Sequence, residues 1–191
     1  MQTLIFLITT LFDLYLMVVL LRVWLQWARA DFYNPLSQFT VKATHPILAP
    51  LRRIIPSLGG LDLAGVLLAW LVALLKFVVM SLLLGGLPQL SVLLIFSLLM
   101  VLKQAGSLLF WILVVRAILS WVSQGRSPVE YVLMQLADPL LRPIRNLLPS
   151  MGGIDFSPMV LVLLLYVINM GIAEVLQATG NVLLPGLWMA L

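Results

Sequence analysis

The sequence predicts an all-α, polytopic membrane protein with four transmembrane helices in two parallel tandem repeats, each repeat carrying a short amphipathic interfacial helix. Of the 191 residues, 63% are hydrophobic and 9% are charged, whereas soluble domains lie nearer one half and one quarter. Four apolar segments reach the roughly 20 residues that a helix needs to cross a bilayer. A proline- and glycine-containing motif also occurs twice, 93 positions apart. These three observations exclude a soluble globular domain.

The predicted spans cover residues 4–27, 63–84, 92–121 and 157–177. The first has no basic region before its apolar run and no small-residue cleavage site after it, so we expect a retained helix and no signal peptide. The stretch "GGLPQ" (85–89) predicts a turn between the second and third spans. The stretch "KQAGS" (103–107) interrupts the third apolar segment. Residues 92–103 therefore form either part of the third span or a separate re-entrant helix.

The repeat covers nearly the whole chain. "RVWLQW" (22–27) matches "RAILSW" (116–121) at an offset of 94, and "HPILAPLRRIIPSLGGLD" (45–62) matches "DPLLRPIRNLLPSMGGID" (138–155) at an offset of 93. The first repeat spans residues 1–90 with a loop at 28–62, and the second spans 91–191 with a loop at 122–156 and an outer tail after 177. Because a unit of two spans returns to its starting side, the halves are predicted to be parallel.

Basic residues concentrate in the two long loops. They are Arg29, Lys42, Arg52 and Arg53 in the first, and Arg126, Arg142 and Arg145 in the second. The N-terminal tail, the middle turn and the tail after Gln177 contain no Lys or Arg. The positive-inside rule therefore predicts cytoplasmic loops and periplasmic termini. Trp27 and Trp121, with Arg22 and Arg116 nearby, are typical of the cytoplasmic membrane interface, where arginines extend toward the headgroups.

Each motif copy predicts a short amphipathic helix at the membrane surface. Its apolar residues recur at i, i+1, i+4, i+7 and i+8, which is one helical face: Ile47, Leu48, Leu51, Ile54 and Ile55, then Leu140, Leu141, Ile144, Leu147 and Leu148. Four arginines lie away from that face and are candidates for binding anionic lipid headgroups or a partner protein: Arg52, Arg53, Arg142 and Arg145. The plainer alternative is that the motif has no binding role and forms only a surface helix, a proline that ends it and an aspartate that caps the next span.

The prolines, glycines and aspartates of the motif predict its turns. We expect Pro46 and Pro139 in the first turn of the helix, with Asp138 as a cap. Pro50 and Pro143 should bend the helix, and Pro56 or Pro149 should end it. The doublets Gly59-Gly60 and Gly152-Gly153 permit positive φ, so that the chain can turn into the bilayer. Asp62 and Asp155 are then placed to cap the span that follows. In the second loop, Ser127-Pro128 favours a helix start.

Charged residues inside the spans form a second candidate site. Asp13, Lys76, Lys103 and Glu174 all lie there, although a centred Asp or Lys costs on the order of 3 kcal/mol to insert. The repeat offset matches Asp13 with Ser107 and Lys76 with Asn169. Small residues at Gly65, Ala69 and Ala73 permit close packing, and Lys76 beside them is expected to face the bundle. The polar residues form either an interhelical network that fixes packing or a path for an ion or proton.

No catalytic chemistry is predicted. There are no cysteines and only one histidine, His45, and no zinc spacing, phosphate-binding loop, dinucleotide fingerprint or nucleophile elbow occurs. We therefore expect no enzyme activity, no metal and no cofactor. The net charge of +4 is ordinary for a membrane protein with basic cytoplasmic loops, and the basic residues form no stripe for nucleic acid.

The two tandem units resemble the YggT repeat family of bacterial and plastid membrane proteins, in the long form of Gram-negative bacteria. The resemblance rests on the tryptophan-bearing helix end, the "NP" or "SP" that follows, and the pattern P-[IL]-L-x-P-[LI]-R with P-S-x-G-G-x-D. It implies an inner-membrane protein with cytoplasmic repeat loops. Members are linked to cell division, membrane-complex assembly, plastid cytochrome and nucleoid functions, and osmotic-stress tolerance with potassium uptake. The family offers no catalytic residues to carry over.

Two functions follow as expectations. The first is a non-enzymatic membrane, assembly or osmotic-stress factor that acts through its duplicated cytoplasmic helices on anionic lipids or on a membrane-protein partner. The second is a protein that conducts a potassium-type cation or regulates its transport through the intramembrane charges, as an oligomer because four spans alone do not enclose a pore.

Overall fold

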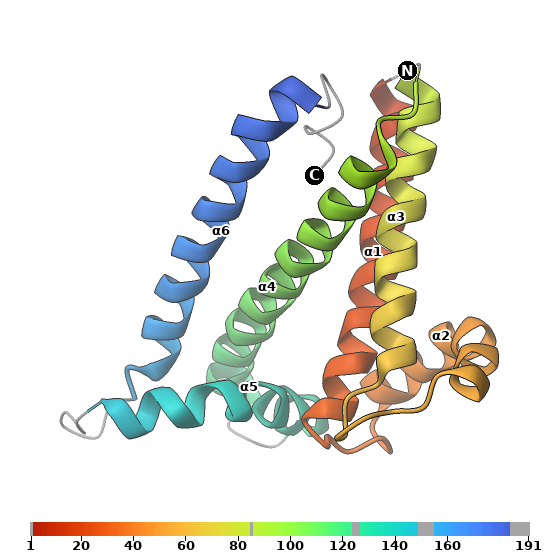
Figure 1. Ribbon diagram of the computed structural model, residues 1–191. Coiled ribbons are helices and arrows are strands. Elements are labelled where there is room, and N and C mark those ends of the chain that lie inside the picture. The colour runs from red at the N-terminus through yellow and green to blue at the C-terminus, as the bar shows by residue number, and fades with distance from the viewer. Residues whose placement is uncertain (1, 85, 124–126, 149–154, 184–191) are drawn as a thin grey trace.

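The computed structural model describes residues 2–84, 86–123, 127–148 and 155–183 (Figure 1). Within these ranges the regular elements are helices, as the sequence predicts: α1 (Gln2–Trp27), α2 (Pro35–Ile54), α3 (Leu63–Leu84), α4 (Leu90–Ser123), α5 (Pro128–Leu147) and α6 (Ser157–Leu183). Four of them, α1, α3, α4 and α6, are long and apolar enough to cross a membrane. The all-α membrane fold is therefore confirmed.

The long helices stand side by side in an order that follows the repeats. Helices α1 and α3 pack against each other, α4 starts beside them and inclines away toward α5, and α6 stands on the far side of α4 (Figure 1). Helix α4 is continuous over 34 residues, so residues 92–103 belong to the third span and form no separate re-entrant helix. A helix of this length extends about 50 Å, well beyond the roughly 30 Å of a hydrocarbon core, which agrees with its inclination in Figure 1.

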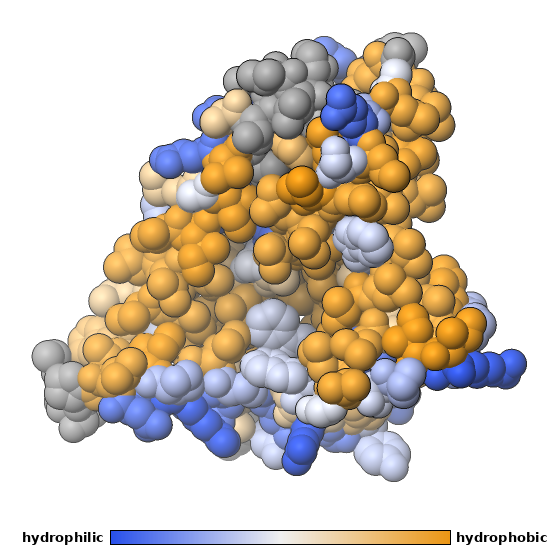
Figure 2. Space-filling model, in the orientation of Figure 1, coloured by the Kyte–Doolittle hydropathy of each residue, from blue (hydrophilic) through white to orange (hydrophobic). Residues whose placement is uncertain are grey.

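Helices α2 and α5 both lie at one end of the bundle, here called the motif side, and α5 runs across the ends of the spans (Figure 1). Hydrophobic residues cover the sides of the long helices, while hydrophilic residues gather along the motif side (Figure 2). The exposed apolar residues on the long helices include Phe6, Leu11 and Leu164. Exposed side chains of this kind suit contact with lipid tails.

The two surface helices are longer than the motif predicts. Helix α2 begins at Pro35, where the Asn34 side chain accepts a hydrogen bond from the Ser37 amide (2.9 Å). Helix α5 begins at Pro128, as Ser127-Pro128 predicts. The expectation that Pro46 and Pro139 occupy the first turn is wrong, because both lie inside a helix of 20 residues. Asp138 is likewise an interior residue and caps no helix.

Internal prolines are tolerated here because of the face on which they lie. Pro46 and Pro50 are four residues apart, so they share one side of α2, and both are exposed. Each proline leaves the carbonyl four residues before it without its helical donor. On an exposed face, water or a headgroup can supply that hydrogen bond. Proline inside a helix therefore destabilises α2 less than its usual cost within a helix would suggest.

Small residues bring α1 and α3 into close contact. Ala69 and Ala73 are fully buried and Gly65 is buried beside them, so the predicted small-residue stripe does face the bundle. A Cβ atom at Gly65 would lie 2.6 Å from Cγ2 of Val23 and 2.8 Å from Oδ2 of Asp62. Only glycine fits at this crossing without a shift of its neighbours.

Gly65→Ala is therefore expected to lower the free energy of unfolding by about 1–3 kcal/mol, the usual cost of overpacking a tight contact. Unfolding by sodium dodecyl sulfate, followed by circular dichroism in detergent micelles, measures this change. Gly171→Ala is the matched control, because it is also inside a spanning helix and a Cβ there would meet nothing within 4 Å. Equal effects at the two positions would contradict a packing role for Gly65.

Hydrogen bonds from tryptophans connect the two repeats. Trp70 on α3 donates from Nε1 to Ser97 Oγ on α4 (2.9 Å), and Trp24 on α1 donates to the Leu136 carbonyl oxygen on α5 (3.0 Å). The Asp31 amide also donates to Gln135 Oε1 (3.0 Å). Among the described residues, α6 packs extensively against α4 and α5 alone, so it is the least enclosed of the four spans.

Candidate functional site

In the first motif copy, an arginine–aspartate ion pair joins the end of α2 to the residue before α3. Arg52 Nη2, near the end of α2, lies 2.5 Å from Asp62 Oδ2, directly before α3. The same nitrogen donates to Gln26 Oε1 on α1 (2.7 Å). Asp62 is only 1% exposed. The pair therefore joins the surface helix to the start of the next span.

A two-glycine turn makes this pairing possible. Leu58 and Leu61 exchange backbone hydrogen bonds of 3.1 and 3.0 Å, and between them Gly59 and Gly60 have φ values of 60° and 90°. These are the positive φ angles that the sequence predicts for the doublet, and other residues adopt them at a cost. Pro56 follows the end of α2 and precedes this turn. The turn reverses the chain so that residue 62 returns to residue 52.

The second motif copy contains the equivalent pair. Arg145 Nε lies 2.8 Å from Asp155 Oδ2, and Arg145 Nη1 lies 3.0 Å from Asp138 Oδ1. We call the two repeat-related pairs, Arg52–Asp62 and Arg145–Asp155, the motif clasps. Both join residues ten positions apart. The predicted turn residues Pro149, Gly152 and Gly153 lie outside the described residues.

The two clasp aspartates differ in their further contacts. Asp155 Oδ1 accepts a hydrogen bond from the Ser157 amide at the start of α6 (2.9 Å), so it satisfies an amide that has no partner within the helix. Hydrogen bonds from Ser157, together with the Arg145 guanidinium, hold the pKa of Asp155 below its ordinary value. In the described part of the chain, the side-chain hydrogen bonds of Asp62 go to Arg52 instead.

The remaining candidate arginines are more accessible. Arg53 is exposed, and the side chain of Arg142 is 74% exposed while it pairs with Asp138 at 3.1 Å.

Burial tends to raise the pKa of Asp138, but hydrogen bonds from Arg145 and Arg142 outweigh that effect and lower it. Partial burial likewise tends to lower the pKa of Arg145, but Asp155 and Asp138 raise it. These carboxylates are therefore held in their charged form.

Arg22 has buried contacts with α2 that the sequence did not predict. It is 5% exposed and donates from Nη1 to Thr44 Oγ1 (2.7 Å) and to the Val41 carbonyl oxygen (3.0 Å) of α2. The expected extension of Arg22 toward the headgroups is therefore wrong, because α2 covers it. The available signal was the set of hydroxyl residues Ser37, Thr40 and Thr44 on one face of α2, all of them buried.

The intramembrane charges form a pair between α1 and α3. Lys76 Nζ lies 2.7 Å from Asp13 Oδ1, and the two side chains are 3% and 35% exposed. Lys103 on α4 is close enough to interact electrostatically with Lys76. The pair lies on the side of α3 that also carries the small-residue stripe.

The other predicted network residues lie elsewhere. Lys103 and Asn169 line a cavity of about 240 Å³ between α4 and α6, together with Ser107. Glu174 lies on the exposed surface of α6. The structure thus divides the predicted network into an ion pair in the first repeat and a polar-lined cavity in the second. Among the described residues, no three His, Asp or Glu side chains gather closely enough to hold a metal ion.

Comparison with known proteins gives one consistent family. The profile of the CCB3/YggT family matches residues 1–83 and 92–176, which are the two repeats. The chain is 64% identical to the uncharacterized protein YggT of Escherichia coli (strain K12) over 191 residues, the full length of both. It is 46% identical to an uncharacterized protein of Pseudomonas aeruginosa over 177 residues, covering 91% of this chain and 90% of the relative. No solved structure matches the chain.

Proposed function

This chain belongs to the CCB3/YggT family, and we propose that it is a non-enzymatic integral protein of the inner membrane whose motif side binds anionic lipid headgroups from the cytoplasm. In this proposal, α2 and α5 lie in the membrane interface and both termini lie in the periplasm, as the distribution of basic loop residues indicates. The family resemblance further suggests that this surface serves membrane assembly or osmotic-stress tolerance.

One observation carries the proposal: the last turns of each surface helix present both an exposed arginine and a highly exposed apolar residue. Ile54 is 80% exposed and Leu147 is 84% exposed, and they occupy equivalent repeat positions. Arg53 precedes Ile54, and Arg142 lies five residues before Leu147. An apolar side chain that enters the acyl region beside an arginine at the phosphates is typical of interfacial helices.

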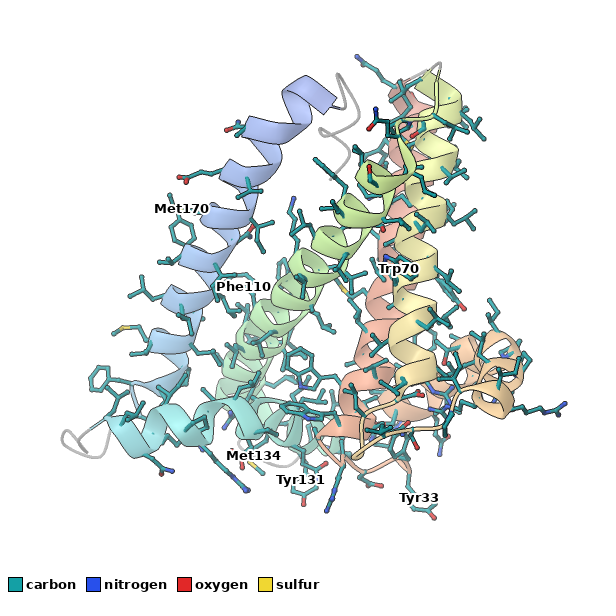
Figure 3. All side chains as sticks on the ribbon, in the orientation of Figure 1. Tyr33, Trp70, Phe110, Tyr131, Met134 and Met170 are labelled. Atoms are coloured by element: carbon teal, nitrogen blue, oxygen red, sulfur yellow. The ribbon has the colours of Figure 1, made fainter. Side chains whose placement is uncertain are left out.

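Aromatic side chains on the motif side support the same placement. Tyr33 is 89% exposed and Tyr131 is 54% exposed, and Figure 3 shows both at the end of the molecule where α5 lies. Tyrosine is enriched at the level of the lipid headgroups. Within this surface the clasp residues Arg52 and Arg145 position α2 and α5, while Arg53 and Arg142 make the lipid contacts.

The double variant Arg53→Gln with Arg142→Gln tests this proposal. Native mass spectrometry of the full chain in detergent, with phosphatidylglycerol added, is expected to show a several-fold loss of bound lipid. Binding of phosphatidylcholine should not change, because that headgroup carries no net charge. Each exposed headgroup contact contributes on the order of 1 kcal/mol.

Arg29→Gln with Lys42→Gln is the matched control, since it removes two exposed charges from the first loop but none from the helix ends. The control is expected to bind nearly as much phosphatidylglycerol as the unmodified protein. An equal loss in both double variants would mean that net charge alone governs binding. Unchanged lipid binding with loss of a co-purifying membrane protein would instead indicate a protein partner.

The competing proposal is permeation or regulated transport of a potassium-type cation. Its support is the presence of Asp13, Lys76 and Lys103 within the spans. However, the Asp13 carboxylate forms an ion pair with the buried ammonium group of Lys76. It is therefore not available to replace the hydration shell of a passing cation. The pair geometry therefore favours a packing role for these charges.

A further inference from the structure

The two repeats differ at one pair of equivalent positions inside the membrane. In the first repeat, Asp13 and Lys76 meet as an ion pair across α1 and α3. Their counterparts in the second repeat are Ser107 on α4 and Asn169 on α6, at offsets of 94 and 93. These two residues line the cavity between α4 and α6. The second repeat thus has an open space where the first repeat has a direct contact.

Two polar side chains that line this cavity have no hydrogen-bond partner among the described residues. Within the described part of the chain, neither the Ser107 hydroxyl nor the side-chain amide of Asn169 makes a hydrogen bond. Tyr166 and Lys103 also line the cavity, and the rest of its wall is apolar, with Phe110 and Leu165 among the side chains. A largely apolar pocket with a few convergent polar groups is typical of a small-molecule site, and an unsatisfied amide at this depth is costly.

The depth of the cavity defines how a ligand would reach it. Asn169 lies 12 residues after the start of α6, which is about 18 Å along the helix and near the middle of the hydrocarbon core. The cavity is partly open to its surroundings, and within the described ranges α6 packs against α4 and α5 but on no further helix to a similar extent. The ligand must therefore arrive through the lipid phase.

We propose that the cavity between α4 and α6 binds a membrane-soluble molecule that carries hydrogen-bond-accepting oxygen atoms on an apolar tail. The hydroxyl of Ser107, the amide N–H groups of Asn169 and the phenol of Tyr166 are donors for such oxygen atoms. A volume of about 240 Å³ holds about eight water-sized groups, which suits a compact head with its tail in the bilayer.

Two membrane-soluble classes share this chemistry: the carboxylate of a long-chain fatty acid and the carbonyl oxygens of a quinone. The experiment uses oleate and decylubiquinone as probes, each added to the purified full chain in detergent, with bound mass read by native mass spectrometry. Binding of either probe at micromolar concentration is the expected result. Preference for oleate identifies a carboxylate ligand, and preference for decylubiquinone identifies a neutral carbonyl ligand.

Two variants approach the cavity from opposite walls. Gly106→Leu fills it from α4, where a Cβ atom would lie 3.9 Å from its nearest neighbour, Leu165 Cδ2. Asn169→Leu removes the amide from α6. Each is expected to reduce binding of the preferred probe at least tenfold, with the thermal unfolding temperature as the check on folding.

Thr10→Val is the control, because its hydroxyl bonds only to its own helix, at the Phe6 carbonyl oxygen, and it should bind as the unmodified chain does. The proposal is overturned if neither probe binds, or if a probe binds equally to the unmodified chain and to both folded cavity variants.

Discussion

Asp13→Asn is expected to lower the free energy of unfolding by about 3 kcal/mol, because it leaves the ammonium group of Lys76 without its counter-charge. The side chain of Lys76 is only 3% exposed, and removal of one partner from a buried ion pair costs a few kcal/mol. The neutral amide introduced by this substitution can still accept a hydrogen bond but cannot balance a charge. Unfolding by sodium dodecyl sulfate in micelles, followed by circular dichroism, measures the loss.

Lys76→Met is the informative counterpart. Asp13 is 35% exposed, so its carboxylate is less desolvated than the Lys76 ammonium group when its partner is removed, and methionine fills much of the lysine volume. We expect a loss of about 1 kcal/mol, and the double variant Asp13→Asn with Lys76→Met should be more stable than Asp13→Asn alone. If instead both single variants fold normally and change potassium flux in proteoliposomes, the ion-path function is favoured over packing.

Asp62→Asn is expected to have the second largest effect, about 2–3 kcal/mol, because it breaks a motif clasp at its buried end. Asp62 is the counter-charge of Arg52, and Arg22 is also within electrostatic range of both groups. Without the carboxylate, two guanidinium groups repel each other between α1 and α2. Limited proteolysis at residues 55–61 should become faster as α2 separates from the start of α3.

Asp155→Asn provides the comparison within the same molecule. Its side chain is 44% exposed, against 2% for Asp62, so solvent screens the charge that remains on Arg145. The expected loss is below about 1 kcal/mol. Equal destabilisation by the two variants, or none by Asp62→Asn, would show that the clasp of the first repeat does not hold α2 in place.

The spanning helices could be predicted from sequence because a bilayer constrains both the length and the backbone hydrogen bonding of any segment that crosses it. An apolar run long enough to cross a membrane must satisfy its own backbone hydrogen bonds, and a helix does this within one segment. The predicted spans 4–27, 63–84, 92–121 and 157–177 therefore correspond to α1, α3, α4 and α6, with ends that differ by a few residues. The "KQAGS" stretch did not break α4, since one interior glycine costs only about 1 kcal/mol.

The surface helices were harder to delimit from sequence. Pro46 and Pro139 were expected to mark the first turn, while the actual starts follow Asn34 and Ser127. The Asn-Pro and Ser-Pro pairs had the correct composition for a helix start. The Ser127-Pro128 pair did predict the start of α5, but the motif prolines predicted a second, later start, because the cost of an interior proline depends on which face it occupies. That face is known only once α2 is packed on α1.

Contacts between distant residues could be predicted only in part. Sequence placed Asp13 and Lys76 in one polar group, but which residues pair depends on the rotation of each helix about its axis. The clasps did leave a signal, since arginine and aspartate recur ten positions apart in both motif copies. They were assigned separately to lipid binding and to capping because the intervening glycine turn hides their proximity.

The pairing of opposite charges within the first repeat has a consequence for biosynthesis. Asp13 with Lys76, and Arg52 with Asp62, all lie within the first 84 residues. A nascent chain that has delivered α3 to the bilayer can therefore neutralise these charges before α4 enters the bilayer. The first repeat can thus pair its own charged side chains before they are exposed to lipid. Helices α4, α5 and α6 then pack against a first repeat in which these charges are already paired.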